Sequence, residues 1–151
     1  MATLPILLKN PQILLLGGGS VAYQKAKVLK ENQISFTVIA LDYKPQFVDL
    51  QLDSLTKSVT ASDLAKYNII IDATGNDDVG LLLQDEKLRR FVLINRVDQP
   101  DQSDFYFSSL LNYGSLKIAV STDGASPTIG QVVRDKISSI IPDDIGDLVA
   151  E

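Results

Sequence analysis

The sequence predicts an α/β fold: a Rossmann-like, mostly parallel sheet with helices on both faces, followed by a short β-hairpin and helix. Apolar strand-like runs alternate with helix-like runs between residues 12 and 97, the pattern of a parallel α/β sheet. The first apolar run, "QILLLG", stops at three consecutive glycines, and a helix-like stretch follows. A length of 151 residues, with 45% hydrophobic and 22% charged residues, suits an ordinary soluble globular protein.

Five strands are expected in the first part of the chain. Most are continuous apolar runs, as expected of strands that are buried on both faces of a sheet. The third is a short β-branched run, which is typical of an edge strand. The expected strands cover residues 12–17, 36–41, 54–60, 67–74 and 91–97.

Helix-like segments separate these strands. Apolar residues recur at helical spacing over residues 21–32, and Pro45 begins a short helix or turn. A helical turn at residues 62–67 is expected to be capped by Ser62 or Asp63. A helix over residues 78–89 is expected to direct four apolar side chains inward: Val79, Leu82, Leu83 and Leu88.

The alternation ends at a polar loop, residues 98–104. Two strand-like runs, "FYFSSLL" and "SLKIAVS", then flank the turn residues Asn112 and Gly114 and predict a hairpin. This change divides the chain into a Rossmann domain, residues 1–104, and a short C-terminal extension, residues 105–151, on the expected dimer or substrate side.

A helix closes this extension. It is expected over residues 127–141, with Ser126 as its N-cap and Pro127 at its first position. The last residues of the chain are expected to form a short acidic tail.

The composition excludes several kinds of chemistry. The chain has no cysteine and no histidine, which rules out thiolate catalysis, zinc sites built on Cys or His, Ser-His-Asp triads and a histidine proton shuttle; no metal site is expected. Acid–base chemistry must therefore come from carboxylates, lysine, tyrosine or the substrate. A formal charge of −5 without a basic run gives no footprint for nucleic acid. The sequence shows neither a membrane span nor a signal peptide, so we expect a cytoplasmic protein.

The glycine turn fits the dinucleotide fingerprint G-x-G-x-x-[GA]. Gly17, Gly19 and Ala22 occupy its three positions, directly after an expected strand and at the start of an expected helix. Gly17 makes the tight turn, Gly19 lets a pyrophosphate approach the backbone, and Ala22 lets the helix pack close to the strand. A sharp corner without a ligand is the alternative, but the strand–turn–helix context favours dinucleotide binding.

The end of the second strand bears on the choice of cofactor. Asp42 stands 20 residues after Ala22, where the fingerprint expects an acid that holds the ribose hydroxyls. An acid there would repel a 2′-phosphate, and Lys44 is the only cation at this tip, so NAD is favoured over NADP. A solvated loop carboxylate is an equally good interpretation of Asp42.

The loop after the fourth strand is expected at the carboxyl edge of the sheet, beside the glycine turn, where ligands bind in such folds. Thr74, Gly75 and Asn76 could contact the cofactor there, or Gly75 could end the strand while Asn76 caps the helix. The expected cofactor-binding residues are Gly17, Gly18, Gly19, Ser20, Val21, Leu41, Asp42, Thr74, Gly75 and Asn76.

Several stretches occur in an order that points to one family. They are "LPILL", "GGGSVAYQKAKVLKE", "NRVDQPDQSDFYF" and "KIAVSTDGASP". As a set they resemble the precorrin-2 dehydrogenase/sirohydrochlorin ferrochelatase family, the N-terminal part of siroheme synthases, from residue 4 to about residue 140. The resemblance implies a Rossmann domain whose NAD removes a hydride from precorrin-2 to give sirohydrochlorin. Some members then insert ferrous iron to make siroheme.

The resemblance also implies site residues. Asp98, in "NRVD", matches the acid–base residue of the family, although an aspartate near Pro100 could simply open a turn. Ser126, in "GASP", matches a position facing the tetrapyrrole pocket, although a helix N-cap explains it equally. Arg96 replaces an apolar residue of the family pattern, and it could bind a substrate carboxylate or lie at a frayed strand end.

The resemblance further implies a homodimer with a tetrapyrrole polycarboxylate as its ligand, and no nucleic-acid or membrane partner. Family members generally continue into a helical region after the "TDGASP" helix, whereas this sequence stops soon after it. A separate chelatase partner is therefore the alternative to iron insertion by this chain. A second class of function, an NAD(H)-sensing Rossmann module without catalysis, would use the glycine turn and Asp42 but gives the later motifs no role.

Overall fold

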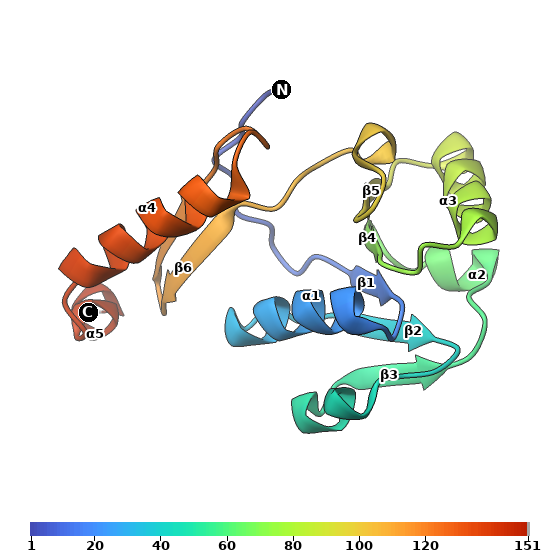
Figure 1. Ribbon diagram of the computed structural model, residues 1–151, viewed down its shortest axis with the longest axis horizontal. Coiled ribbons are helices and arrows are strands. Elements are labelled where there is room, and N and C mark those ends of the chain that lie inside the picture. Colours follow the sequence, from blue (N-terminus) through green and yellow to red (C-terminus); the bar gives the residue numbers. More distant parts are fainter. Residues whose placement is uncertain (151) are drawn as a thin grey trace. The chain divides into compact units, whose positions relative to one another are not determined.

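The computed structural model describes residues 1–150, which form two compact units. The larger unit is Leu7–Phe105, and the smaller one combines Met1–Ile6 with the chain from Tyr106 onward. The larger unit holds a five-stranded sheet, and the smaller one holds a two-stranded hairpin (Figure 1).

The sheet of the larger unit is parallel throughout, with the strand order β3-β2-β1-β4-β5, which confirms the predicted Rossmann-like α/β class (Figure 1). The central strand β1 is buried along its whole length, as its continuous apolar run predicted. The elements are β1 (Ile13–Leu16), α1 (Ser20–Glu31), β2 (Thr37–Ala40), η1 (Pro45–Leu50), β3 (Asp53–Thr56), α2 (Ala61–Leu64), β4 (Ile69–Asp72), α3 (Asp77–Arg89), β5 (Leu93–Arg96) and η2 (Pro100–Gln102).

Helices cover both faces of this sheet. On one face, Ala22 and Leu29 of α1 and Phe47 of η1 pack in a single apolar cluster with the strands. On the other face, Leu64 of α2 and Leu83 of α3 belong to a second cluster. The neighbouring strands β1 and β4 therefore send their following helices to opposite faces. In open α/β sheets, ligands bind beside the carboxyl ends of two such strands.

The helix α3 buries a narrower stripe than the sequence suggested. Leu83 is buried, and Val79 and Leu82 pack against the same cluster, as predicted. Leu88 is 87% exposed, so its predicted inward orientation is wrong. Leu88 follows Leu83 by five residues and therefore lies about 140° around the helix from the buried stripe.

The cap of α2 is Thr60 rather than Ser62 or Asp63. The Thr60 hydroxyl accepts a hydrogen bond from the Asp63 N–H, and the Asp63 carboxylate accepts one from the Thr60 N–H at 2.9 Å, so the two residues form a capping box. Lys57 pairs with Asp63 across 2.7 Å. The hydrogen bond from Lys57 holds the pKa of the Asp63 carboxyl below its usual value.

We expect Asp63→Asn to lower the free energy of unfolding at neutral pH, by about 1 kcal/mol. Because the pKa of Asp63 is lower in the folded state, its contribution is present above the unfolded-state pKa of about 3.9 and is lost as the pH falls through the folded-state pKa. The two proteins should therefore converge in stability in acid. Urea unfolding at neutral pH and at about pH 3 measures this, and an equal difference at both pH values would contradict the assignment.

The smaller unit contains the predicted hairpin and helix. Ser126 caps α4 through its hydroxyl, which accepts a hydrogen bond from the Ile129 N–H at 3.3 Å. Asn112 lies inside a strand, opposite Lys117, so the turn begins at Gly114 and the prediction that Asn112 is a turn residue is wrong. The elements are β6 (Ser109–Tyr113), β7 (Leu116–Val120), α4 (Pro127–Ile140) and α5 (Ile145–Ala150), so the expected acidic tail contains a short helix. Within residues 1–150, no helix has the length and apolar character needed to cross a membrane.

Candidate cofactor and active site

The glycine turn between β1 and α1 is held against the end of β4. Gly17 has a φ of +117°, a conformation that residues with a side chain rarely adopt. A Cβ atom at Gly17 would also lie 2.8 Å from the carbonyl oxygen of Ala73. Gly17 is therefore required both by its backbone conformation and by the close approach of β4, as expected of the glycine that makes the tight turn.

Gly18 joins the glycine turn to the loop after β2. A Cβ atom at Gly18 would overlap the carbonyl oxygen of Asp42. The Gly18 carbonyl accepts a hydrogen bond from the Lys44 N–H at 2.9 Å. The loops that the sequence assigned to the pyrophosphate and to the ribose are thus fixed to each other.

The beginning of α1 is open for an anion. Its N-cap, Gly19, has a φ of −83° and a ψ of −171°, values that any residue can adopt. Among residues 1–150, apart from Gly19 and its two chain neighbours, no residue has an atom within 4 Å of the Cβ position at Gly19, and no side chain caps the helix. The N–H groups of the first turn, which includes Ser20 and Val21, therefore lie at the positive end of the helix dipole without a capping side chain. This arrangement fits the pyrophosphate of a dinucleotide.

The loop after β2 offers one apolar and one acidic side chain. Leu41 is 69% exposed, and the carboxylate of Asp42 is exposed beside it. Tyr43 anchors the loop, because its hydroxyl donates to the Leu55 carbonyl at 2.7 Å. Burial raises the pKa of the Tyr43 phenol. The exposed Leu41 suits contact with a flat base, and Asp42 suits the hydroxyls of a ribose.

The structure adds Lys44 to the groups around the glycine turn. Its Nζ atom donates a hydrogen bond to the Oγ atom of Ser20, the first residue of α1. A cation at the positive end of a helix dipole is unfavourable unless an anion lies between them. We therefore expect Lys44 to contact an anion that binds at this turn. The sequence did not reveal this because Lys44 follows Ser20 by 24 residues.

The loop after β4 is fixed by its own hydrogen bonds. The N–H and hydroxyl of Thr74 both donate to Oδ1 of Asp72, at 3.0 and 2.6 Å. The side-chain oxygen of Asn76 accepts a hydrogen bond from the Asp78 N–H at 2.8 Å, which confirms Asn76 as the cap of α3. Gly75 has a φ of +62°, so a residue with a side chain would be strained there. Contact of Thr74, Gly75 and Asn76 with a cofactor stays a prediction.

Asp98 lies in the turn after β5 and is exposed. Its Oδ2 atom is 3.8 Å from the position that a Cβ atom would take at Gly75. The carboxylate of Asp98 therefore stands over the loop after β4, whose first residue, Ala73, contacts Gly17 of the glycine turn. The carboxylate of Asp98 and the glycine turn thus flank one loop at the carboxyl edge of the sheet.

Two family models match the chain. Residues 4–109 match the model described as "Putative NAD(P)-binding", and residues 114–140 match "Sirohaem biosynthesis protein central". The chain belongs to the siroheme synthase N-terminal domain family. The predicted resemblance is confirmed, and the domain that carries the glycine turn is of an NAD(P)-binding kind.

Curated relatives of this chain are longer proteins. Siroheme synthase 2 of Pectobacterium atrosepticum is 33% identical over 99% of this chain, and siroheme synthase of Enterobacter sp. is 36% identical over 97%. The chain spans only 34% and 33% of these two relatives. A solved structure, "SirC, precorrin-2 dehydrogenase", matches with a TM-score of 0.83 and 24% sequence identity. The match covers 99% of this chain and 76% of the chain in that structure. This likeness confirms the fold.

Arg96 departs from the apolar residue of the siroheme synthase pattern, and the structure corrects one of the two expectations for it. Arg96 is 4% exposed, so it is not a surface residue at a frayed strand end. Its Nε atom donates to Oδ2 of Asp72 across 3.0 Å. Contact of Arg96 with a carboxylate of a substrate stays a prediction. The sequence did not reveal this pair, because an arginine can be predicted to be buried only once its partner is known, and Asp72 lies 24 residues away in the chain.

Ser126 lies in the smaller unit, whereas the residues of the glycine turn belong to the larger one. Its hydroxyl caps α4, and its N–H donates to the hydroxyl of Thr122 at 3.2 Å. The role as N-cap is therefore confirmed. Contact of Ser126 with a tetrapyrrole stays a prediction.

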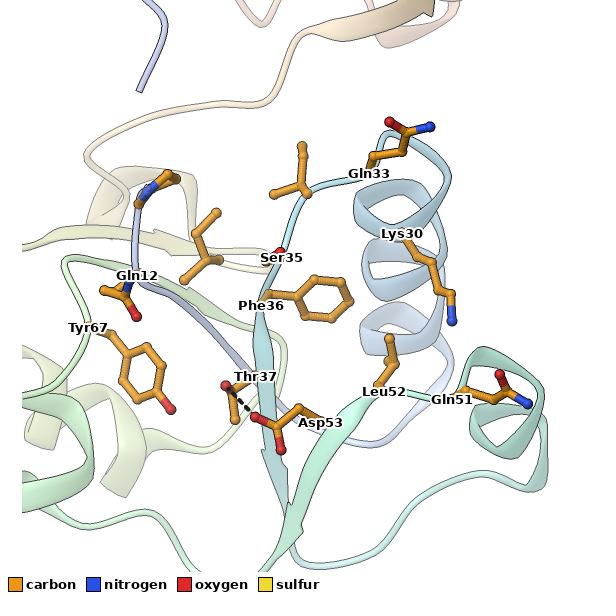
Figure 2. A pocket seen from close by; sticks show the side chains of 13 residues that line it. Gln12, Lys30, Gln33, Ser35, Phe36, Thr37, Gln51, Leu52, Asp53 and Tyr67 are labelled. Carbon is orange, nitrogen blue, oxygen red and sulfur yellow. Dashed lines mark hydrogen bonds between the residues drawn. The ribbon is translucent and has the colours of Figure 1, made fainter. Parts of the chain in front are cut away.

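A cavity of about 550 Å³ lies at the opposite, amino-terminal edge of the sheet, beside the beginnings of β1, β2 and β3 (Figure 2). Phe36 and Leu52 form its apolar part, and a hydrogen bond from Thr37 to Asp53 crosses one end. The cavity includes neither the glycine turn nor Asp98. In parallel α/β sheets the ligand binds at the carboxyl edge, so we assign the cofactor site to the glycine turn rather than to this cavity.

Proposed function

We propose that this chain is an NAD-dependent dehydrogenase that oxidises precorrin-2 to sirohydrochlorin. One observation carries the proposal: the exposed carboxylate of Asp98 stands over Gly75, at the edge of the sheet where the glycine turn lies. This is where a catalytic carboxylate must lie if it is to act beside the reactive end of a dinucleotide. Membership of the siroheme synthase N-terminal domain family supports the reaction.

NAD is the proposed cofactor. The N–H groups at the start of α1, with Lys44, would hold its pyrophosphate, and Asp42 would accept hydrogen bonds from the ribose hydroxyls. The exposed Asp42 carboxylate supports NAD over NADP, because it would repel a 2′-phosphate. Thr74, Gly75 and Asn76 would complete the site from the loop after β4.

The proposed reaction is a two-electron oxidation. NAD supplies the hydride acceptor when it is bound, and one hydride and one proton leave precorrin-2 to give sirohydrochlorin, NADH and H⁺. Asp98 accepts the proton as the hydride departs. A carboxylate suits this task because the chain has no histidine, and exposure leaves Asp98 free to pass the proton on to water.

The substrate side and the assembly are also proposals. The start of α4, with Ser126 as its cap, is proposed to meet one of the carboxylates of the tetrapyrrole. A homodimer is proposed through the smaller unit, whose helix α4 leaves Ile129, Val132 and Ile140 at least half exposed. If iron insertion follows the oxidation, either this chain or a separate chelatase carries it out.

Calorimetric titration tests the binding part of this proposal. The protein is titrated with NAD, then NADP, then sirohydrochlorin. We expect NAD to bind more tightly than NADP and sirohydrochlorin to bind as well. Tight binding of NAD without any binding of sirohydrochlorin would favour a nucleotide-sensing module over the enzyme.

A further inference from the structure

A fully buried ion pair lies beneath the loops that carry the candidate site. Asp72 ends β4 and Arg96 ends β5, and the two are paired in the register of the parallel sheet. Their side chains are 0% and 4% exposed, and Nε of Arg96 lies 3.0 Å from Oδ2 of Asp72. Burying two charges carries a desolvation penalty, and an apolar pair of similar volume would often be as stable. Stability alone therefore does not account for these residues.

The carboxylate of this pair holds the loop after β4. While Oδ2 of Asp72 bonds Arg96, Oδ1 accepts both the N–H and the hydroxyl of Thr74. The Thr74 hydroxyl oxygen in turn accepts the N–H of Asn76 at 3.1 Å. Gly75 therefore lies between Thr74, which is hydrogen-bonded to Asp72, and Asn76, which is hydrogen-bonded to Thr74.

The guanidinium of the pair holds the turn after β5. Its Nη1 atom donates to the side-chain oxygens of Gln102 and Gln99, at 2.7 and 3.3 Å. Its Nη2 atom donates to the Asn76 carbonyl at 3.4 Å, and so returns to the loop after β4. One planar cation thus bonds both loops at once, which the single ammonium of a lysine cannot do.

The helix α3 is shaped around this cation. A Cβ atom at Gly80 would overlap the guanidinium group of Arg96. An alanine at this helical position would favour the helix, so the glycine is explained by the space that Arg96 occupies. Arg96 is therefore built into the packing of the unit and is fixed in its orientation.

We propose that the Asp72–Arg96 pair is a positioning device that sets the carboxylate of Asp98 over Gly75. Asp98 lies between Arg96 and Gln99, which are bonded to each other, and Gly75 lies between Thr74 and Asn76. The pair thereby fixes both the backbone of Gly75 and the Asp98 carboxylate, whose Oδ2 atom lies 3.8 Å from the position that a Cβ atom would take at Gly75. The inference rests on the proposed function for the role of Asp98, while the coupling of the two loops rests on the hydrogen bonds alone.

The variant Arg96→Lys tests this role. It keeps a cation opposite Asp72 but loses the fork that reaches Gln99, Gln102 and Asn76. We expect hydrogen exchange of the backbone amides to quicken together in residues 73–77 and 97–103, by at least about tenfold. Turnover of precorrin-2 should fall by about 10- to 100-fold when it is measured at saturating NAD, so that weaker NAD binding through the loop after β4 does not contribute to the loss.

Arg90→Lys is the matched control. Arg90 caps the far end of α3, where its Nη2 atom donates to the carbonyls of Leu64 and Tyr67, at 2.7 and 2.6 Å. We expect this variant to leave the exchange of both loops and the turnover unchanged. Should Arg96→Lys fail to fold, Gln102→Ala replaces it, because Gln102 is exposed and its loss removes the 2.7 Å bond from Arg96 and a 3.4 Å bond from Gln84, while the bonds from Arg96 to Asp72 and Gln99 remain.

The outcomes separate the inference from the proposed reaction. Wild-type exchange in either loop of the Arg96→Lys variant, or turnover equal to that of Arg90→Lys, would overturn the positioning role. Wild-type protein that does not oxidise precorrin-2 would instead overturn the proposed function and, with it, the positioning of a catalytic Asp98. The exchange pattern would then still decide whether the pair couples the two loops.

Discussion

Asp98→Asn is expected to lower the turnover of precorrin-2 by about 10²- to 10⁴-fold, the usual contribution of a positioned acid–base group. The amide has nearly the same shape as the carboxylate but cannot accept the proton that leaves with the hydride. The Kd for NAD should stay within about twofold of the wild type, because the exposed Asp98 lies over Gly75 and not in the glycine turn. Steady-state formation of NADH and calorimetric titration with NAD measure the two quantities.

Asp101→Asn is the control for Asp98→Asn. Asp101 is an exposed carboxylate in the neighbouring η2 segment, so its loss changes the net charge equally. It should leave turnover unchanged. Turnover of Asp98→Asn that matches this control would remove Asp98 from the mechanism.

Gly19→Ala is expected to raise the Kd for NAD at least about tenfold, which corresponds to about 1.4 kcal/mol. The backbone angles of Gly19 suit alanine, and among the described residues other than its two chain neighbours, none lies within 4 Å of the added methyl group. The methyl group would therefore meet only a ligand that approaches the start of α1. The Tm without cofactor should remain within about 2 °C of the wild type.

Gly18→Ala provides the contrast. Its methyl group would overlap the carbonyl oxygen of Asp42, so the two loops must separate and the Tm should fall even without cofactor, by several degrees for a loss of about 1–3 kcal/mol. If Gly19→Ala bound NAD like the wild type, the pyrophosphate would not lie over Gly19. The two alanine variants thus separate loss of binding from loss of stability.

The sheet and the glycine turn could be predicted because their signals are local. Strand β1 is a continuous apolar run and is buried throughout, and Gly17 has the positive φ that a tight turn requires. Their residue types follow from conformation and burial at the position itself. The same holds for Ser126, which caps α4 directly before Pro127.

The errors concern side chains whose environment is set by distant residues. Arg96 is buried only because Asp72 of the neighbouring strand supplies its counter-charge. Leu88 is exposed because α3 packs through a narrow stripe around Leu83. The role of Lys44 depends on the close approach of two loops at Gly18. Neither these contacts nor the exposure of Leu88 can be predicted from local periodicity or composition.

The most direct test of the central claim is to mix the purified chain with precorrin-2 and NAD and to follow NADH and sirohydrochlorin together. The account predicts one NADH for each sirohydrochlorin formed, and a loss of both products in Asp98→Asn. Tight binding of NAD with no NADH formed from precorrin-2 would contradict it and would leave a nucleotide-binding domain without this chemistry.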